Sequence, residues 1–426
     1  MITKRNSANK ERTLLVGVIH RTNTEEIIAE HLEELTLLAD TAGADVVGLI
    51  TQKIQKINPV YYIGKGKAEQ VVNQAKELDI DLIIFDDDLS STQSKNYQKI
   101  CGDIKVLDRS ALILDIFKNH ALTKESKTQV ELANLQYLLP RLTRLWTHLE
   151  RQMGGIGTRA GAGETQIEVD RRLIRTRISK LKKELVKIEK EREVQGKRRQ
   201  SEFKVALVGY TNSGKSTLLK ALSGADVYIA DQLFATLDTT IRSVDIDSSH
   251  SFLLSDTIGF IRKLPHHLVA SFHSTLSETT EADLLAIILD ASSPSVLEHY
   301  QIIRNVLIEI KADKVPYLVI FNKLDKMDQD IQMGYLKNKL PEGLYISAQN
   351  YLGLDALLHK IKMAMEECYT TAELFVPYEQ GKNISSVQEG VEVIRKMHNE
   401  KGMLFKIRGN RSRIEQLQKM VNGEIK

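Results

Sequence analysis

The stretch KVALVGYTNSGKSTLLK, residues 204–220, decides the fold of the central part of this chain. It places the pattern G-x-x-x-x-G-K-[ST], residues 209–216, between an apolar run typical of a buried strand and a segment typical of a helix. Glycines let such a loop wrap closely around phosphates, with successive backbone N–H groups pointing inward. The stretch therefore predicts an α/β domain with a phosphate-binding loop.

The individual positions of this loop have expected roles. Lys215 would reach the outer phosphates, and the Ser216 hydroxyl would bind Mg²⁺. The residues predicted to hold the nucleotide here are Gly209, Tyr210, Thr211, Asn212, Ser213, Gly214, Lys215, Ser216 and Thr217.

A second box, DTIGF, spans residues 256–260 and follows the apolar run 252–256. Asp256 would hold Mg²⁺ through water, and the Gly259 N–H would contact the γ-phosphate. An ordinary strand-ending Asp with a turn is the alternative. The distance of this box from the phosphate loop favours the nucleotide interpretation.

Two further boxes predict which base is bound. NKLD, residues 322–325, follows the apolar run 317–321, and SAQ, residues 347–349, follows the last expected strand. A buried carboxylate at Asp325 would accept from two guanine donors that adenine lacks, so the boxes predict GTP rather than ATP. The predicted base-binding residues are Asn322, Lys323, Asp325, Ser347, Ala348 and Gln349.

The segment DQLFATLDTT, residues 231–240, has the position and the threonines of a switch I loop. Thr236 is the first candidate for an additional Mg²⁺ ligand, and Thr239 and Thr240 are alternatives. Metal binding is therefore assigned to Ser216, Thr236 and Asp256. A hairpin loop with incidental threonines remains open.

Catalysis departs from the Ras pattern. Ras-like enzymes orient the attacking water with a Gln after the second box, whereas this chain has Phe260 there. We therefore expect slow hydrolysis by the isolated protein. The catalytic candidates are Thr236, Gly259 and Asn212. Asn212 is included because it occupies a position at which some related GTPases bind K⁺. A loop-shaping hydrogen bond is the other interpretation of Asn212.

The N-terminal part alternates between apolar runs and amphipathic segments, which predicts a small parallel α/β domain. Expected strands span 14–20, 44–52, 82–87 and 105–108, and expected helices span 24–42, 67–79 and 90–101. The string YYIGKGKAEQ, residues 61–70, has glycines and lysines at a helix start and could bind phosphate, a second nucleotide such as ATP, or rRNA. A plain strand-to-helix turn is equally compatible with it.

Residues 124–196 predict an antiparallel helical hairpin around the glycine-rich segment 153–166. In its second helix Ile167, Ile174, Ile178, Leu181, Leu185 and Ile188 form a heptad seam. From Arg141 to Lys204 the chain has 18 Lys and Arg and 9 Asp and Glu, a balance of +9, so the rest carries −6 of the net +3. This asymmetry indicates a polyanionic partner, although a solvated helix is the plainer explanation.

The tail from about residue 371 predicts a small α+β domain, with β-like pieces at 374–378 and 404–409 and a helix near 386–398. The chain is thus expected to be a multidomain α/β protein. The expected divisions are an N-terminal α/β domain (1–122), a helical hairpin with linker (123–200), a GTPase domain (201–368) and a C-terminal α+β domain (369–426).

Composition narrows the class of protein. The sequence has no apolar stretch of 18 residues, so no membrane span is expected. Cys101 and Cys368 have no metal-ligand spacing and suit a reducing cytosol. We expect a monomer in the cytoplasm, with partial association with membranes left open.

The chain resembles the HflX family of translation-linked GTPases over about residues 12–366. The resemblance rests on GGIGTRAGAGETQIEVDRR (154–172), GYTNSGKSTLL (209–219), DQLFATLDTT (231–240) and DTIGFIRKLP (256–265). Two departures occur: GAG at 161–163 replaces an expected GPG, and DTT at 238–240 replaces DPTT. Both would loosen a turn without removing a ligand.

The resemblance implies binding to the large ribosomal subunit and to intact ribosomes, with GTP-dependent splitting of stalled or idle ribosomes. The basic segment 141–204 would contact rRNA, with Arg151 and Arg159 at its glycine-rich tip and with Trp146 and His148 stacking on bases or packing in the hairpin. Two alternatives are an NTPase that depends on another RNA and a nucleotide-gated binding switch without useful turnover.

Overall fold

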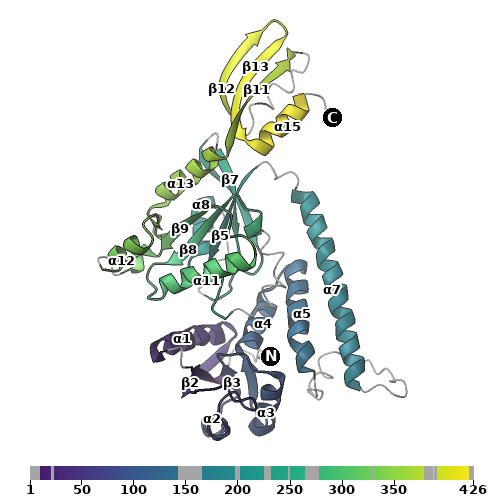
Figure 1. Cartoon of the computed structure of the whole chain (residues 1–426), viewed down its shortest axis with the longest axis vertical. Helices are drawn as coiled ribbons and strands as arrows, with labels where there is room; N and C mark the ends of the chain where they lie inside the picture. Colours follow the sequence, from purple (N-terminus) through teal and green to yellow (C-terminus); the bar gives the residue numbers. More distant parts are fainter. Residues whose placement is uncertain are drawn as a thin grey trace. The chain divides into compact units, whose positions relative to one another are not determined.

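The computed structural model covers the whole chain, and it describes residues 10–20, 24–142, 166–196, 202–224, 232–247, 250–263, 278–327, 331–378, 387 and 391–421. The chain forms two compact units. The first contains Met1–Ile188, Gln232–Leu237 and Lys263–Phe272, and the second contains Glu189–Asp231, Asp238–Arg262 and His273–Lys426. Figure 1 labels the elements of both.

The first unit is built on a parallel four-stranded sheet with the order β2-β1-β3-β4. Its strands are β1 (Glu11–Ile19), β2 (Ala44–Lys53), β3 (Leu82–Phe85) and β4 (Lys105–Asp108). Its connecting helices are α1 (Glu25–Thr41), α2 (Lys65–Glu77), α3 (Ser91–Cys101) and α4 (Arg109–His120). All four strands and three helices expected from the sequence are confirmed, and α4 is an additional helix.

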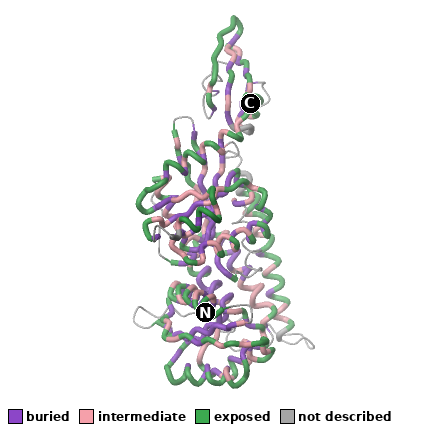
Figure 2. The backbone as a smooth tube through the Cα atoms, turned by 60° about the vertical axis from the view of Figure 1, so that its left-hand side comes forward, coloured by how far each residue is buried: buried purple, intermediate pink, exposed green. Residues whose placement is uncertain are grey.

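Side chains at the helix starts explain where these helices begin. The Thr24 hydroxyl accepts from Ile27 N, and the Asp108 carboxylate accepts from Ala111 N. Ser90 and Gln93 form a reciprocal capping box at α3. Each cap satisfies a backbone donor that the helix itself leaves without a partner. The interiors of β1 and β3 are buried, and their side chains pack with residues of α2 and α3 in this unit's core. Figure 2 shows buried stretches of the chain in purple.

The helical hairpin of the first unit pairs α5 (Lys124–Leu138) with α7 (Gln166–Gly196). Arg177 pairs with Glu131 at 2.7 Å, and Lys124 pairs with Glu184 at 3.0 Å. Residue numbers thus rise in one helix as they fall in its partner, so the two helices run antiparallel. The antiparallel prediction is therefore confirmed. Seam residues Ile174 and Leu181 are buried, as the heptad pattern predicts. The 3-10 turn η1 (Leu139–Arg141) ends α5 at Pro140.

The second unit contains a six-stranded sheet with the order β10-β9-β8-β5-β7-β6, in which only the β6–β7 pair is antiparallel among the described strands. The strands are β5 (Phe203–Gly209), β6 (Thr240–Asp247), β7 (His250–Asp256), β8 (Leu284–Asp290), β9 (Tyr317–Asn322) and β10 (Leu344–Tyr345). The helices are α8 (Lys215–Ser223), α11 (Val296–Glu309), α12 (Ile331–Lys339) and α13 (Leu354–Glu367). The apolar runs expected as strands before the phosphate loop, at 252–256 and at 317–321 are confirmed as β5, β7 and β9.

The tail of the second unit is an antiparallel sheet with the order β11-β13-β12, made of β11 (Tyr369–Pro377), β12 (Glu392–Asn399) and β13 (Gly402–Asn410). Helix α15 (Arg411–Val421) packs on one face through Ile414 and Leu417. The expected helix near 386–398 is wrong, because 392–399 forms β12. Asn399 pairs with Gly402, so a two-residue turn closes a hairpin that overrides the local helical spacing.

Among the described residues, no helix combines the length and the apolar character needed to cross a membrane. The division into four domains expected from the sequence stays a prediction.

Candidate nucleotide site

The phosphate loop lies where β5 ends at Gly209 and α8 begins at Lys215. Gly214 has φ +92°, and a Cβ atom there would lie 2.3 Å from the Asn322 side-chain nitrogen. A Cβ atom on Gly209 would lie 2.5 Å from the Ile288 carbonyl oxygen. Both positions therefore require glycine, because neighbouring atoms leave no room for a Cβ. Gly214 requires it also for its positive φ.

Lys215 is buried beneath this loop. Its Nζ donates to the carbonyl oxygens of Tyr210 at 2.9 Å and Gly209 at 3.3 Å. Burial lowers the pKa of Lys215 to about 8; the Asp256 carboxylate opposes this shift and Lys323 adds to it. The charge of a buried ammonium would be stabilised further by phosphate oxygens nearby.

Ser216 and Asp256 come together at the sheet edge as the sequence predicts. The Ser216 hydroxyl donates to Asp256 Oδ2 at 2.6 Å, and Asp256 is 1% exposed. A hydroxyl beside a carboxylate is an oxygen donor set that suits Mg²⁺, which takes few protein ligands and completes its shell with phosphates and water. The residues present therefore fit the metal.

The base end of the site is organised by Asn322. Its side-chain nitrogen donates to the Ser213 carbonyl at 2.9 Å, and its side-chain oxygen accepts from Ala348 N at 2.9 Å. Ser347 Oγ donates to Asp325 Oδ1. NKLD, SAQ and the phosphate loop are thus joined by hydrogen bonds. Asn322, Ser347 and Ala348 are buried, whereas Asp325 and Gln349 are exposed, so the burial expected for the Asp325 carboxylate is not found.

One contact of this region was not predicted from the sequence. Lys323 adopts φ +62°, and its Nζ lies 2.8 Å from Asp290 Oδ2 at the end of β8. Asp290 follows the apolar run 284–289, and a carboxylate at a parallel strand's carboxyl end is a signal that could have found it.

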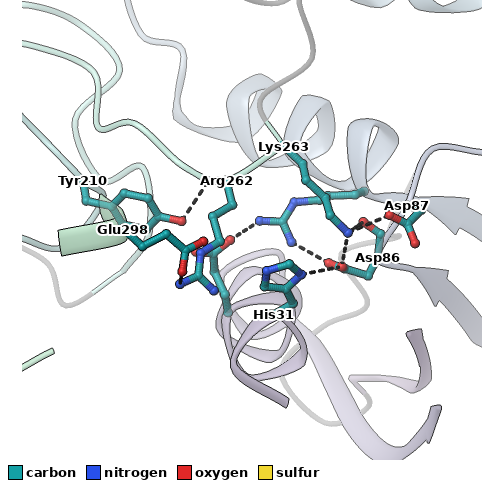
Figure 3. Close-up of polar contacts among 9 residues, drawn as sticks. His31, Asp86, Asp87, Tyr210, Arg262, Lys263 and Glu298 are labelled. Atoms are coloured by element: carbon teal, nitrogen blue, oxygen red, sulfur yellow. Dashed lines mark hydrogen bonds and ion pairs between the residues drawn. The ribbon is translucent and has the colours of Figure 1, made fainter. Parts of the chain in front are cut away.

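The DTIGF box is bonded directly to the phosphate loop. Phe260 N donates to Gly209 O at 3.0 Å, and Thr211 N donates to Phe260 O at 2.8 Å. Phe260 is 1% exposed, which agrees with the expectation that it does not handle the attacking water. In the next polar contact, Arg262 N donates to the Tyr210 hydroxyl at 2.8 Å (Figure 3), a contact that was not predicted from the sequence.

Residues 232–237 of the switch I candidate belong to a different compact unit from the phosphate loop. Residues 232–237 belong to the first unit, where Phe234 stacks edge-on against Phe117 at 4.7 Å between ring centroids and Leu233 N donates to the Thr41 hydroxyl. The role of Thr236 as a Mg²⁺ ligand beside Ser216 and Asp256 stays a prediction. Asn212 is exposed on the phosphate loop with φ +58°.

Several candidate residues lie outside the described part of the chain. These are the glycine-rich segment 153–165 and the side chains of Trp146, His148, Arg151 and Arg159.

Three family models match consecutive parts of the chain. They describe a GTP-binding GTPase N-terminal region at residues 29–118, a GTP-binding GTPase middle region at 120–199 and a 50S ribosome-binding GTPase at 204–323. A GTPase HflX from Caldanaerobacter subterraneus subsp. tengcongensis is 44% identical over 404 residues, which are 93% of this chain and 91% of that relative. This chain belongs to the HflX family. It is therefore a GTPase that binds guanine nucleotide.

Other HflX relatives support the same assignment. GTPase HflX of Escherichia coli (strain K12) is 42% identical over 371 residues, 86% of each chain. That of Flavobacterium psychrophilum is 48% identical over 322 residues, 76% of this chain and 77% of the relative. A Sulfolobus solfataricus GTP-binding protein solved with GDP is 27% identical, covers 83% of this chain and 98% of its own, and has a TM-score of 0.43. The family assignment rests on the sequence relatives.

Proposed function

We propose that this HflX-family GTPase binds the large ribosomal subunit in the cytoplasm and splits stalled or idle ribosomes in a GTP-dependent way. Hydrolysis is slow in the isolated protein and is stimulated by the ribosome. The match of residues 204–323 to the model described as a 50S ribosome-binding GTPase supports this proposal.

The observation that carries the proposal is the basic surface of α7. A hollow on this helix is lined by one acidic and five basic side chains, together with Thr176 and Ser179. The charged residues are Glu168, Arg171, Arg172, Arg175, Lys180 and Lys183. Arg175, Lys180 and Lys183 are exposed and all line this hollow, and these three residues form the basic stripe of α7. Such a stripe attracts a phosphate backbone and favours shape-directed contact with folded RNA.

The metal assignments are part of the same proposal. Ser216 and Asp256 would hold Mg²⁺, with Thr236 as a further ligand, and Asn212 would hold K⁺ beside the phosphates. Mg²⁺ neutralises the charge that develops on the transferred phosphate. The short Ser216–Asp256 contact supports the Mg²⁺ assignment.

Co-sedimentation with ribosomal subunits tests the proposal. One triple variant reverses the charge of the stripe: Arg175→Glu, Lys180→Glu, Lys183→Glu. The matched control reverses the charge of three exposed lysines elsewhere: Lys311→Glu, Lys314→Glu, Lys360→Glu. With a non-hydrolysable GTP analogue, we expect the stripe variant to bind large subunits roughly tenfold or more weakly, with a smaller dependence on salt. The control should bind like the parent.

Equal binding by the two triple variants would contradict the role of α7. Failure of the parent to sediment with large subunits, together with strong binding of other RNA, would replace the ribosome by a different RNA as partner.

A further inference from the structure

The pairing between β5 and β7 continues past the ends of both strands. The last regular pair is Leu207 with Asp256, yet Tyr210 and Phe260 form a further parallel bridge. Two backbone hydrogen bonds make this bridge, from Phe260 N to Gly209 O and from Thr211 N to Phe260 O. The phosphate loop and the DTIGF box are therefore joined edge to edge.

A side chain of the phosphate loop extends this junction. The Tyr210 hydroxyl accepts from Arg262 N at 2.8 Å, two residues beyond the bridge. The Tyr210 ring is 6% exposed and stacks on the His299 imidazole, with 3.9 Å between centroids and 16° between planes. This hydroxyl is thus held by a buried, stacked ring and is well placed to fix the chain at Arg262.

Helix α11 supports both partners of this hydrogen bond. It provides His299 beneath the Tyr210 ring, and the preceding residue Glu298 pairs with the Arg262 guanidinium at 3.0 Å (Figure 3). Arg262 is 6% exposed, so the guanidinium of this ion pair is largely shielded from solvent. The residues after DTIGF are consequently held by the phosphate loop and by α11 together.

The joined arrangement leaves little room beside Gly259. A Cβ atom on Gly259 would lie 2.8 Å from Thr211 Cγ2 and 3.1 Å from Lys215 Nζ. A γ-phosphate has to fit between the lysine Nζ and the Gly259 N–H, because it binds both groups. The Thr211 N–H is also already donated to Phe260 O. A third phosphate bound between these groups would have to displace the DTIGF segment or the lysine side chain, whereas a diphosphate does not reach Gly259.

We propose that the Tyr210 hydroxyl is a specificity-determining contact that holds the DTIGF segment against the phosphate loop and so weakens GTP binding relative to GDP. Binding of the third phosphate breaks the contact. The free energy of the broken contact therefore makes the binding free energy of GTP less favourable and leaves that of GDP unaffected. The proposal concerns the nucleotide site within the second unit and is independent of the ribosomal function proposed above.

The variant Tyr210→Phe tests this, since it removes the hydroxyl and keeps the ring on His299. Titration calorimetry of the full chain with GDP and with a non-hydrolysable GTP analogue gives the ratio of the two dissociation constants. We expect the ratio to shift by about 2- to 10-fold in favour of the analogue, which is the range of one lost hydrogen bond. Tyr345→Phe is the matched control, because its ring also stacks in this unit, on Phe321, and both affinities should stay at the parental values.

The outcomes are distinct. Unchanged affinities, or equal changes for GDP and the analogue, would overturn the proposal. Weaker binding of the analogue alone would also overturn it, since the hydroxyl would then place Gly259 productively. His299→Leu removes the support of the ring and should shift the ratio in the same direction by a smaller factor; a shift the opposite way counts against the proposal.

Discussion

The side-chain amide of Asn322 donates to the Ser213 carbonyl across 109 residues of sequence, and its oxygen accepts from Ala348 N. One buried amide therefore links the base-binding boxes to the phosphate loop. Both bonds are directed to backbone groups, so a substitution that removes the amide leaves these groups without a partner.

We expect Asn322→Ala to weaken GDP and GTP binding alike, by about 10- to 100-fold, because each lost buried bond costs about 1–3 kcal/mol and the loop can partly relax. Fluorescent nucleotide titration measures both affinities. Asn338→Ala, at an exposed position of α12, is the control and should bind normally. A loss confined to one nucleotide would show that Asn322 does not act through the shared loop.

Asp325→Asn should change base preference. The carboxylate offers two acceptors to guanine, whereas the amide offers one acceptor and one donor, which suits xanthine better. Competition binding should show the variant losing preference for GTP over xanthosine triphosphate by at least about tenfold. A preference as strong as that of the parent would remove Asp325 from the base site.

Much of this site was predictable because each box follows an apolar strand. Buried parallel strands are strong local patterns, so the apolar run 317–321 was expected before NKLD and is found as β9. The Tyr210–Arg262 contact was not predictable, since it joins residues 52 apart through a tertiary arrangement that a single sequence does not record. β12 was mistaken for a helix because Val391, Ile394 and Met397 recur every three residues, while its hairpin partner lies farther along the chain.

Intrinsic GTP hydrolysis should be slow and should rise steeply with large ribosomal subunits. Phe260 is buried and supplies no proton acceptor for the attacking water. Single-turnover hydrolysis with and without subunits measures the effect, and a comparison of K⁺ with Na⁺ in the same assay examines Asn212. Full turnover by the isolated chain would show that another group already positions the water.

The buried cluster around Asp86 in the first unit should make stability depend on pH. Asp86 accepts from Arg109 Nη1 at 2.7 Å and from Lys263 Nζ at 2.5 Å, and His31 Nδ1 lies 3.6 Å away (Figure 3). Burial raises the pKa of Asp86, but His31, Arg109 and Lys263 together outweigh it and lower that pKa to about 2.

A carboxyl whose pKa is lower in the folded protein stabilises the fold above its unfolded pKa of 3.8, and that contribution is lost as the pH falls toward about 2. Asp86→Asn should therefore lower the Tm at pH 6, and the Tm difference from the parent should shrink between pH 5 and pH 2.5. Asp45→Asn, an exposed control in β2, should show a constant small difference. A pH-independent difference for Asp86→Asn would contradict the lowered pKa.

Nucleotide binding and hydrolysis have separable roles in the proposed splitting of ribosomes. If nucleotide binding orders the segments around Thr236 and Gly259, docking alone can supply the free energy that parts the subunits, and hydrolysis serves only release. A non-hydrolysable analogue should then support one round of splitting and leave the protein on the large subunit. Sedimentation profiles measure this, and intact ribosomes persisting with the analogue would refute the binding-driven mechanism.

Deletion of residues 154–163 examines the same mechanism from the hairpin. Those residues lie outside the nucleotide boxes, so GTP affinity should stay close to that of the parent while splitting is abolished. The stripe of Arg175, Lys180 and Lys183 remains in this variant, and binding to large subunits should therefore weaken less than in the triple reversal. Full splitting by the deletion variant would mean that the hairpin only orients other parts of the chain, and that the subunits are parted elsewhere.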